Sequence, residues 1–334
     1  MGKHFACVAN GQPITTLFWK DRMNRRTALA LGSAFLASTG SLGAQPLTSM
    51  AAGAVPEESV TPALWAESSG IFRRAGLDVS VKSQGSGTAI AAAVAGGSYA
   101  VGKSSLSSLI AAHARGLPFV LIAGGSLYDT KNPYSNLCVK ADSPLKTAAQ
   151  LNGKTIASPA LNDITTVATK AWIDQHGGDS STIKVIEFPF AAIADALAAG
   201  RVDAGFIADP ILAQAVEAGK VRIFAHAFDA IAPQFMVTGW FVTADYAAKN
   251  HNAVVAFNRA MNEASRYIET HPNDAVAGLA KFSGIEPSAI AKSHRLAYAA
   301  LDTKNVQPVI DAYVKYKLIS APFDAKELIT PGLR

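Results

Sequence analysis

Short apolar runs of strand length alternate with alanine-rich stretches of helical length along most of this chain, and few folds accommodate that pattern. From residue 46 onward the strand-like runs occupy 47–53, 77–82, 99–102 and 119–123. The stretches between them at 88–95 and 105–114 have a helical composition. Strands that alternate with helices form βαβ units, in which parallel strands pair beneath a cover of helices. We therefore predict an α/β fold whose mainly parallel sheets are flanked by helices.

The alternation begins again near residue 155, which indicates a second unit of the same kind. Strand-like and helix-like runs follow one another at 155–158, 164–176, 184–188, 191–199, 204–207, 211–218 and 221–225. Residues 92–102 and 196–206 resemble each other, because each is a helical run, a glycine cap and a buried strand. Beyond this unit we predict a strand at 235–243, one long amphipathic helix at 244–270 and shorter helices to the end.

Residues 1–44 have the organisation of an export signal. An arginine pair at 25–26 precedes a short apolar run, and small residues follow it up to Ala44. The paired arginines indicate a twin-arginine (Tat) signal, and the apolar run is too short to span a bilayer. We predict cleavage after Ala44, with Met23 as the true start and 1–22 as a mis-called extension. The mature protein is then expected to be soluble and exported.

The charge composition argues against a nucleic-acid partner. The chain has 30 Lys and Arg against 25 Asp and Glu, but five of the basic residues and one of the acidic residues fall within 1–44. The remaining 25 basic and 24 acidic residues leave almost no positive excess for binding a phosphate backbone. Two cysteines cannot form a disulfide framework. Cys7 lies in the export segment, and Cys138 lies in an apolar run that predicts a buried, unreactive thiol.

Residues with catalytic chemistry are present but scattered. The histidines show no H-E-x-x-H motif, and the chain has no G-x-S-x-G or C-x-x-C arrangement. Asp78, Asp203 and Asp209 are too far apart in sequence to be interpreted as a carboxylate pair. We therefore expect no catalytic residues, no metal site and no cofactor.

Three segments carry a family resemblance. Residues 65–79, W-A-E-S-S-G-I-F-R-R-A-G-L-D-V, are similar to a family segment of the form A-E-x-x-G-(F/I)-F-x-x-x-G-L-D-V. Residues 140–157 are similar to the segment between the lobes of the same family, and 196–204 followed by Asp209-Pro210 is the third match. Over about 46–282 the chain thus resembles the periplasmic substrate-binding proteins of ABC importers for nitrate, sulfonates, taurine and thiamine-precursor pyrimidines.

The resemblance implies a type II periplasmic-binding fold, in which two α/β lobes joined by crossing strands close on a ligand in the cleft between them. Lobe 1 would comprise 45–135 and 236–334, and lobe 2 would comprise 136–235. The chain would cross between the lobes near 134–140 and 235–242. The resemblance also implies a periplasmic, monomeric receptor whose partners are a small-molecule ligand and an ABC permease in the inner membrane, without nucleic acid.

Candidate binding residues follow from the fold class, because ligands of open α/β sheets bind beyond the carboxyl ends of the strands. Helix N-termini in these loops present free N–H groups that favour an anion. Lys103 is the basic side chain among them, and Asp163, if it is not simply a helix cap, would repel an anion. The candidate ligand-binding residues are Glu58, Ser59, Gly85, Ser86, Gly87, Thr88, Lys103, Ser104, Ser105, Ser158, Asn162, Asp163, Thr165, Phe190 and Asp209.

The sequence leaves more than one function open. The first expectation is a small organic anion of the sulfonate, carboxylate or nitrate type, recognised by Lys103. Carboxylates at Glu57 and Glu58 would instead suit an amine or the amino-pyrimidine edge of a thiamine precursor. A sensory module that presents its ligand to a receptor needs the same closing cleft. The wider superfamily also includes pyrimidine-synthesising enzymes marked by a cysteine-rich cluster, which this sequence lacks.

Overall fold

The structure, a computed structural model, describes residues 46–209, 211–292 and 295–333. Residues from Pro46 onward form one compact unit, and this unit is described by itself below. The predicted export signal and its cleavage site lie outside the described residues. In the described part of the chain, no helix is both long enough and apolar enough to cross a membrane.

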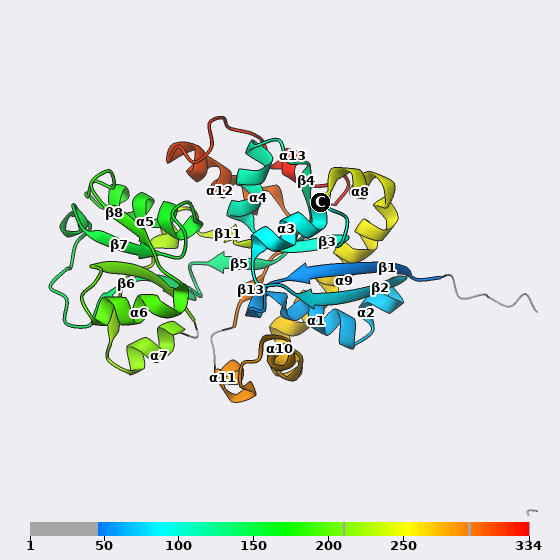
Figure 1. The fold of residues 1–334 in the computed structure, drawn as a ribbon, viewed down its shortest axis with the longest axis horizontal. Helices are drawn as coiled ribbons and strands as arrows, with labels where there is room; N and C mark the ends of the chain where they lie inside the picture. Colours follow the sequence, from blue (N-terminus) through cyan, green and yellow to red (C-terminus); the bar gives the residue numbers. More distant parts are fainter. Residues whose placement is uncertain (1–45, 210, 293–294, 334) are drawn as a thin grey trace, which may run out of the picture. The chain divides into compact units, whose positions relative to one another are not determined.

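The first main sheet has five strands in the order β2-β1-β3-β12-β4 (Figure 1). The strands are β1 (Thr48–Ala54), β2 (Leu77–Ser83), β3 (Val101–Ser105), β4 (Phe119–Gly124) and β12 (Thr238–Thr243). Strand β1 pairs in parallel with β2 and β3, whereas β12 is antiparallel to β3 and β4. Four strands therefore run in one direction, and β12, which enters the sheet from the other half of the unit, runs against them.

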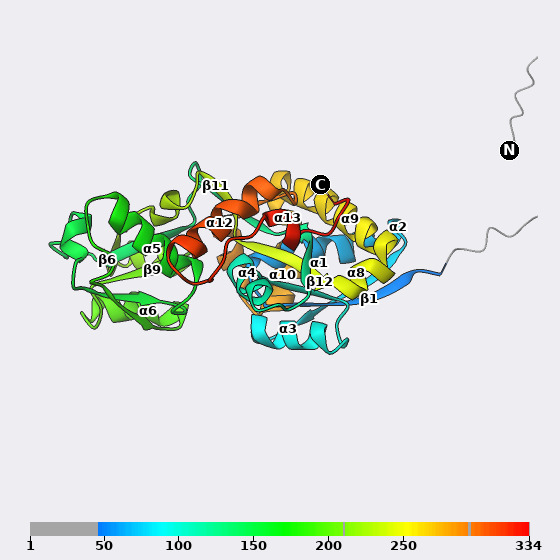
Figure 2. The same ribbon diagram turned by 90° about the horizontal axis from the view of Figure 1, so that it is seen from above.

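Helices cover both faces of this sheet. Figure 2 shows α3 (Gly87–Ala95) on one face and α9 (His251–Thr270) on the other. Helices α1 (Thr61–Ser68) and α2 (Ile71–Arg74) pack beside α9. The remaining helices of this half are α4 (Leu106–Ala114), α8 (Ala244–Lys249), α10 (Val276–Ser283), α11 (Pro287–Lys292), α12 (Thr303–Lys315) and α13 (Ala325–Leu328).

The second main sheet repeats the plan in the order β10-β6-β9-β7-β8. Its strands are β6 (Ser135–Lys140), β7 (Thr155–Ser158), β8 (Lys184–Glu187), β9 (Ala204–Ala208) and β10 (Val221–Ala225). Here too four strands run in one direction, because only β6 is antiparallel to its neighbours β9 and β10. The helices of this half are α5 (Ile164–Gln175), α6 (Phe190–Ala198) and α7 (Ile211–Glu217). The predicted α/β fold with mainly parallel sheets is confirmed.

A three-stranded ladder connects the two main sheets (Figure 1). It consists of β5 (Ser126–Asp129), through which the chain leaves β4, β11 (Gln234–Met236), through which it returns to β12, and β13 (Ala297–Tyr298). Gly124, just before β5, approaches the backbone so closely that a Cβ there would lie 2.0 Å from the carbonyl oxygen of Ala299. A glycine is needed at this point for the crossing strand to pass.

Two elements that we predicted as continuous are each divided in two in the structure. The predicted strand at 235–243 is two strands, β11 and β12, which belong to different sheets. The predicted helix at 244–270 is α8 followed by α9, with a break at Asn250, where φ is −123° and ψ is 36°. The Asn250 side chain donates a hydrogen bond to the Tyr246 carbonyl oxygen (3.1 Å). Such a local side-chain bond competes with continuation of the helix.

Candidate functional site

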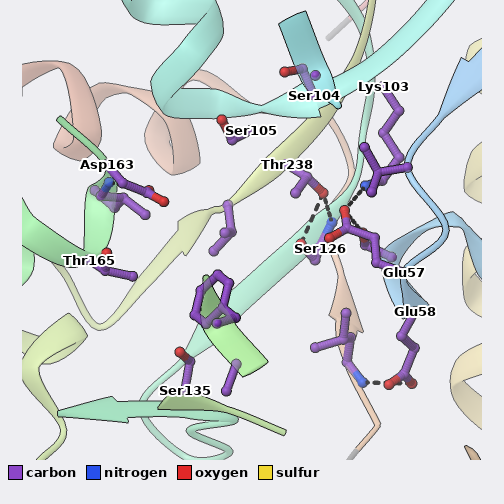
Figure 3. Close-up of a pocket in the computed structure, with 18 of the residues that line it drawn as sticks. Glu57, Glu58, Lys103, Ser104, Ser105, Ser126, Ser135, Asp163, Thr165 and Thr238 are labelled. Carbon is purple, nitrogen blue, oxygen red and sulfur yellow. Dashed lines mark hydrogen bonds and ion pairs between the residues drawn. The ribbon is translucent and has the colours of Figure 1, made fainter. Parts of the chain in front are cut away.

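A cavity of about 390 Å³ is lined by residues from both main sheets and from the connecting ladder. Figure 3 shows Glu57, Lys103, Ser126 and Thr238 on one side of it, with Asp163 across from them. Most of the sequence-predicted candidates line this cavity, namely Glu58, Ser59, Gly87, Thr88, Lys103, Ser104, Ser105, Asp163, Thr165, Phe190 and Asp209. The fold therefore brings residues that are more than a hundred positions apart in sequence into the lining of one cavity.

Four predicted candidates do not line the cavity and instead support its walls. Gly85 and Ser86 precede the lining residues, and the Ser86 hydroxyl caps α3 by accepting a hydrogen bond from Ala89 N (3.2 Å). The buried Ser158 hydroxyl lies 2.8 Å from the Thr165 hydroxyl and holds it in place. Asn162 offers its carbonyl oxygen to the Tyr313 hydroxyl (2.9 Å) rather than its side chain to the cavity.

Lys103 lines the cavity as a member of an ion pair. Its Nζ lies 2.6 Å from Oε1 of Glu57, and the Ser59 hydroxyl donates a second hydrogen bond of 2.7 Å to the same oxygen. The Lys103 side chain is only 1% exposed, whereas the Glu57 side chain is 49% exposed. Burial alone would raise the pKa of the Glu57 carboxyl, but the charge of Lys103 and these hydrogen bonds bring the pKa below its usual value. The ammonium group expected to bind an anion is therefore already neutralised.

Glu58 forms a second ion pair at the edge of the cavity. Nη1 of Arg295 lies 3.4 Å from Oε1 of Glu58, which also accepts a hydrogen bond from Leu296 N (3.4 Å). Burial raises the pKa of the Glu58 carboxyl despite these favourable contacts, and the nearby Asp209 adds to the rise. Arg295 contributes to a smaller neighbouring cavity of about 240 Å³, which shares Glu58 with the main one.

Asp163 is the N-cap of α5, where its carboxylate accepts a hydrogen bond from Ile164 N. Burial raises the pKa of Asp163 to about 6, and the negative charge of Glu57 across the cavity contributes to the rise. A carboxyl with this pKa gains most of its charge over the interval between pH 5 and pH 7.

Stability should consequently depend on pH through Asp163. The folded-state pKa of Asp163 lies above its usual value of 3.8, so the protonated form of Asp163 stabilises the folded protein relative to the unfolded chain. This stabilisation is complete below pH 4 and is lost as the pH rises through 6. The free energy of unfolding of the wild type, minus that of Asp163→Asn, should fall by about 2 kcal/mol between pH 4 and pH 7. Asparagine is the matched substitution because it caps helices as well as aspartate does.

Urea denaturation of both proteins at pH 4, 5, 6 and 7 measures this difference. Parallel stability curves for wild type and Asp163→Asn, or a wild type that gains stability relative to the variant as the pH rises, would contradict the assignment.

Several lining residues were not predicted from the sequence. Ser126 begins the crossing strand β5 and Thr238 begins β12, and the Thr238 hydroxyl accepts a hydrogen bond from Ser126 N (2.9 Å). Tyr134 and Phe228 add aromatic surface to that of Phe190. The sequence contained one signal for Ser126 and Thr238, the pair of glycines before Ser126. These glycines allow two chain segments to approach closely, since a Cβ on the second glycine would lie 2.4 Å from the Thr238 hydroxyl.

The ionisable groups of the lining are mostly acidic. Among the described residues, the lining carboxylates belong to Glu57, Glu58, Asp163 and Asp209, against the single ammonium group of Lys103. Arg295 compensates Glu58 from the neighbouring cavity. Asp209 also caps α7, where it accepts a hydrogen bond from Ala213 N (3.0 Å). Carboxylates therefore outnumber ammonium groups in the described lining.

Solved structures of periplasmic binding proteins have the same fold as this chain. The aliphatic sulphonate-binding protein SsuA from Escherichia coli has a TM-score of 0.71 and 21% identity over 86% of this chain and 98% of that chain. The nitrate-binding protein NrtA from Synechocystis PCC 6803 has a TM-score of 0.67 and 15% identity over 84% of each chain. The desulfurization enzyme DSZB is also similar, with a TM-score of 0.60 and 15% identity over 86% of this chain and 97% of that chain.

The sequence model of the NMT1/THI5-like family matches residues 57–275. The chain belongs to this family, as its resemblance to substrate-binding proteins predicted. A search of curated proteins found no match. Within the described residues there is no group of three or more His, Cys, Asp or Glu side chains arranged to hold a metal ion.

Proposed function

We propose that this protein is the periplasmic solute-binding component of an ABC importer and that its ligand is a small amine-bearing solute with an aromatic or apolar body. An aminopyrimidine is one molecule of this description. In this proposal the exported protein acts as a monomer without catalytic activity: the two lobes close on the ligand, and the closed form delivers it to a permease in the inner membrane. A sensory receptor in place of the permease would use the same cavity.

The Glu57–Lys103 ion pair is the observation that carries the ligand class. An anionic ligand needs an uncompensated positive charge, and the charge of Lys103 is already balanced by a carboxylate 2.6 Å away. An anion would then also meet the carboxylate of Asp163, which is ionised at neutral pH, in the same cavity. A protonated amine finds the opposite environment, since unlike charges attract strongly where water is excluded.

The helix N-termini around the cavity support the same preference. Ser86, Ser105 and Asp163 cap α3, α4 and α5 with their own side chains. Each cap takes an N–H group that an anion would otherwise use. The hydroxyls of Ser104 and Thr165, together with the aromatic residues of the lining, provide hydrogen bonds and apolar contact for a neutral ring.

A small organic anion is the second candidate ligand. Its support comes from the structural neighbours, because the solved SsuA and NrtA proteins are described as binding sulphonate and nitrate. To bind such a ligand here, Lys103 would have to leave Glu57 for the ligand, and Glu57 would remain in the cavity as a repelling charge.

A thermal-shift screen with small ligands of opposite charge distinguishes the two candidates. Benzylamine and 4-aminopyridine would be compared with benzoate, benzenesulfonate and nitrate on protein that has been unfolded, dialysed and refolded. A ligand present at about 100 times its dissociation constant stabilises by roughly 2.7 kcal/mol, which raises Tm by several degrees in a chain of this size. We expect the amines to raise Tm and the anions to leave it unchanged. Stabilisation by the anions alone would contradict the proposed ligand class.

A further inference from the structure

The carboxylate of Glu57 lies where the anionic group of a ligand would have to bind. Within the described chain both of its hydrogen bonds go to Oε1, one from Lys103 Nζ and one from the Ser59 hydroxyl. Glu57 lines the cavity and is half-exposed there, whereas Lys103 is almost fully enclosed. Two donors of an anion site are thus present and are occupied by a side chain of the protein itself.

We infer that Glu57 is the specificity-determining residue of the cavity: an internal carboxylate that occupies a latent anion site on Lys103 and excludes anionic solutes. The inference rests on the proposed function, because it explains how a cavity that contains a lysine would still prefer an amine. It predicts that removal of the Glu57 carboxylate converts the cavity into a receptor for small carboxylates and sulfonates.

Lys103 would stay aimed at the vacated position. It lies within β3, where its backbone is opposite Trp240 of β12, so the strand cannot shift without breaking the sheet. Its side chain is only 1% exposed, and it lines the cavity. Once unpaired, its ammonium group would still line the cavity, where an anion could take the place of the Glu57 carboxylate.

The backbone around Glu57 does not depend on its side chain. Glu57 has φ of −137° and ψ of 167°, an extended conformation that any residue adopts. Its N–H donates to the Val55 carbonyl oxygen (2.9 Å), and its own carbonyl oxygen accepts from Val60 N (3.2 Å). An alanine at this position therefore keeps the loop and leaves a space the size of a carboxymethylene group beside Lys103 and Ser59.

The test compares Glu57→Ala with the wild type, using acetate and ethanesulfonate as probes. Acetate matches the carboxylate that the substitution removes, and ethanesulfonate tests a larger anion. Thermal melts and calorimetric titrations would be recorded at pH 7.5 and constant chloride concentration. We expect both anions to raise the Tm of Glu57→Ala by several degrees and to bind it at least tenfold more tightly than the wild type.

Two further variants control for net charge and for the role of Lys103. Asp163→Asn removes one negative charge from the same cavity without releasing a lysine, so it should gain much less anion binding than Glu57→Ala. Glu57→Ala/Lys103→Met removes the proposed donor and should lose the gain. If Glu57→Ala does not fold, Glu57→Gln keeps the shape of the side chain, removes its charge and is tested in the same way.

The outcomes separate the inference from the proposed function. If neither Glu57→Ala nor Glu57→Gln binds the anions more tightly than the wild type, or if Asp163→Asn gains as much as they do, Glu57 is not the specificity-determining residue. If instead the wild type itself binds acetate and ethanesulfonate tightly, the proposed preference for an amine fails.

Discussion

Replacing Glu57 by alanine is expected to lower the free energy of unfolding by about 3 kcal/mol, whereas replacing Lys103 by methionine should lower it by about 1 kcal/mol. The two members of the ion pair differ in their access to solvent: Lys103 is 1% exposed and Glu57 is 49% exposed. Without Glu57, the Lys103 ammonium group is left buried and unpaired. Without Lys103, the Glu57 carboxylate can be hydrated from the cavity, and methionine still fills the space of the lysine stem.

The double variant Glu57→Ala/Lys103→Met completes this thermodynamic cycle. It should be more stable than Glu57→Ala alone, because no unpaired charge remains in the protein interior. Urea denaturation at pH 7 in acetate-free buffer measures all four free energies. Equal losses for the two single variants, or a larger loss for Lys103→Met, would show that the buried lysine is not the member that depends on its partner.

Replacing Trp240 by alanine is expected to lower the free energy of unfolding by about 4 kcal/mol, the largest single effect that we predict. The indole is fully buried on β12, with Lys103 of β3 and Ala123 of β4 as its neighbours across the sheet. It also packs edge-on against Phe257 of α9, with ring centroids 5.7 Å apart. Its loss opens a cavity between the sheet and the helix that flanking side chains can fill only in part.

Trp65→Ala provides the matched control. Trp65 is half-buried and stacks on Tyr267 with ring centroids 4.9 Å apart, so the same substitution removes a contact nearer the surface. We expect its effect on the unfolding free energy to be less than half that of Trp240→Ala. Denaturant melts that give the two variants the same stability would contradict the view that Trp240 lies in the packed interior of this half.

The order of strands and helices could be predicted from the hydrophobic period of each segment and from the glycines that end helical runs. The run 77–82, for example, becomes β2 (Leu77–Ser83), and the glycine-capped echo at 196–206 leads into β9 (Ala204–Ala208). The break between α8 and α9 could not be predicted in this way. At the break the Asn250 side chain donates a hydrogen bond to the Tyr246 carbonyl oxygen, a local contact that the hydrophobic period on either side does not reveal.

The cavity was predictable in part for a similar reason. Asp163 follows the end of β7, and Lys103 lies in the carboxyl-terminal part of β3, so the strand-end rule locates both near the ligand position. The pairing of Lys103 in β3 with Glu57 in the loop after β1 joins residues 46 positions apart and depends on β1 and β3 lying side by side. Sequence reasoning therefore identified the lysine but assigned its charge to the ligand rather than to the protein.

The preference of the cavity for a cationic solute is tested most directly by isothermal titration calorimetry of the refolded wild type with benzylamine and with benzoate. The two molecules have the same ring and opposite charges, so the comparison isolates the electrostatics of the site. We expect benzylamine to bind at least tenfold more tightly at pH 7.5 and to lose affinity at pH 5, where Asp163, with its pKa of about 6, is protonated. Tighter binding of benzoate at pH 7.5 would contradict the proposal that this receptor takes up an amine.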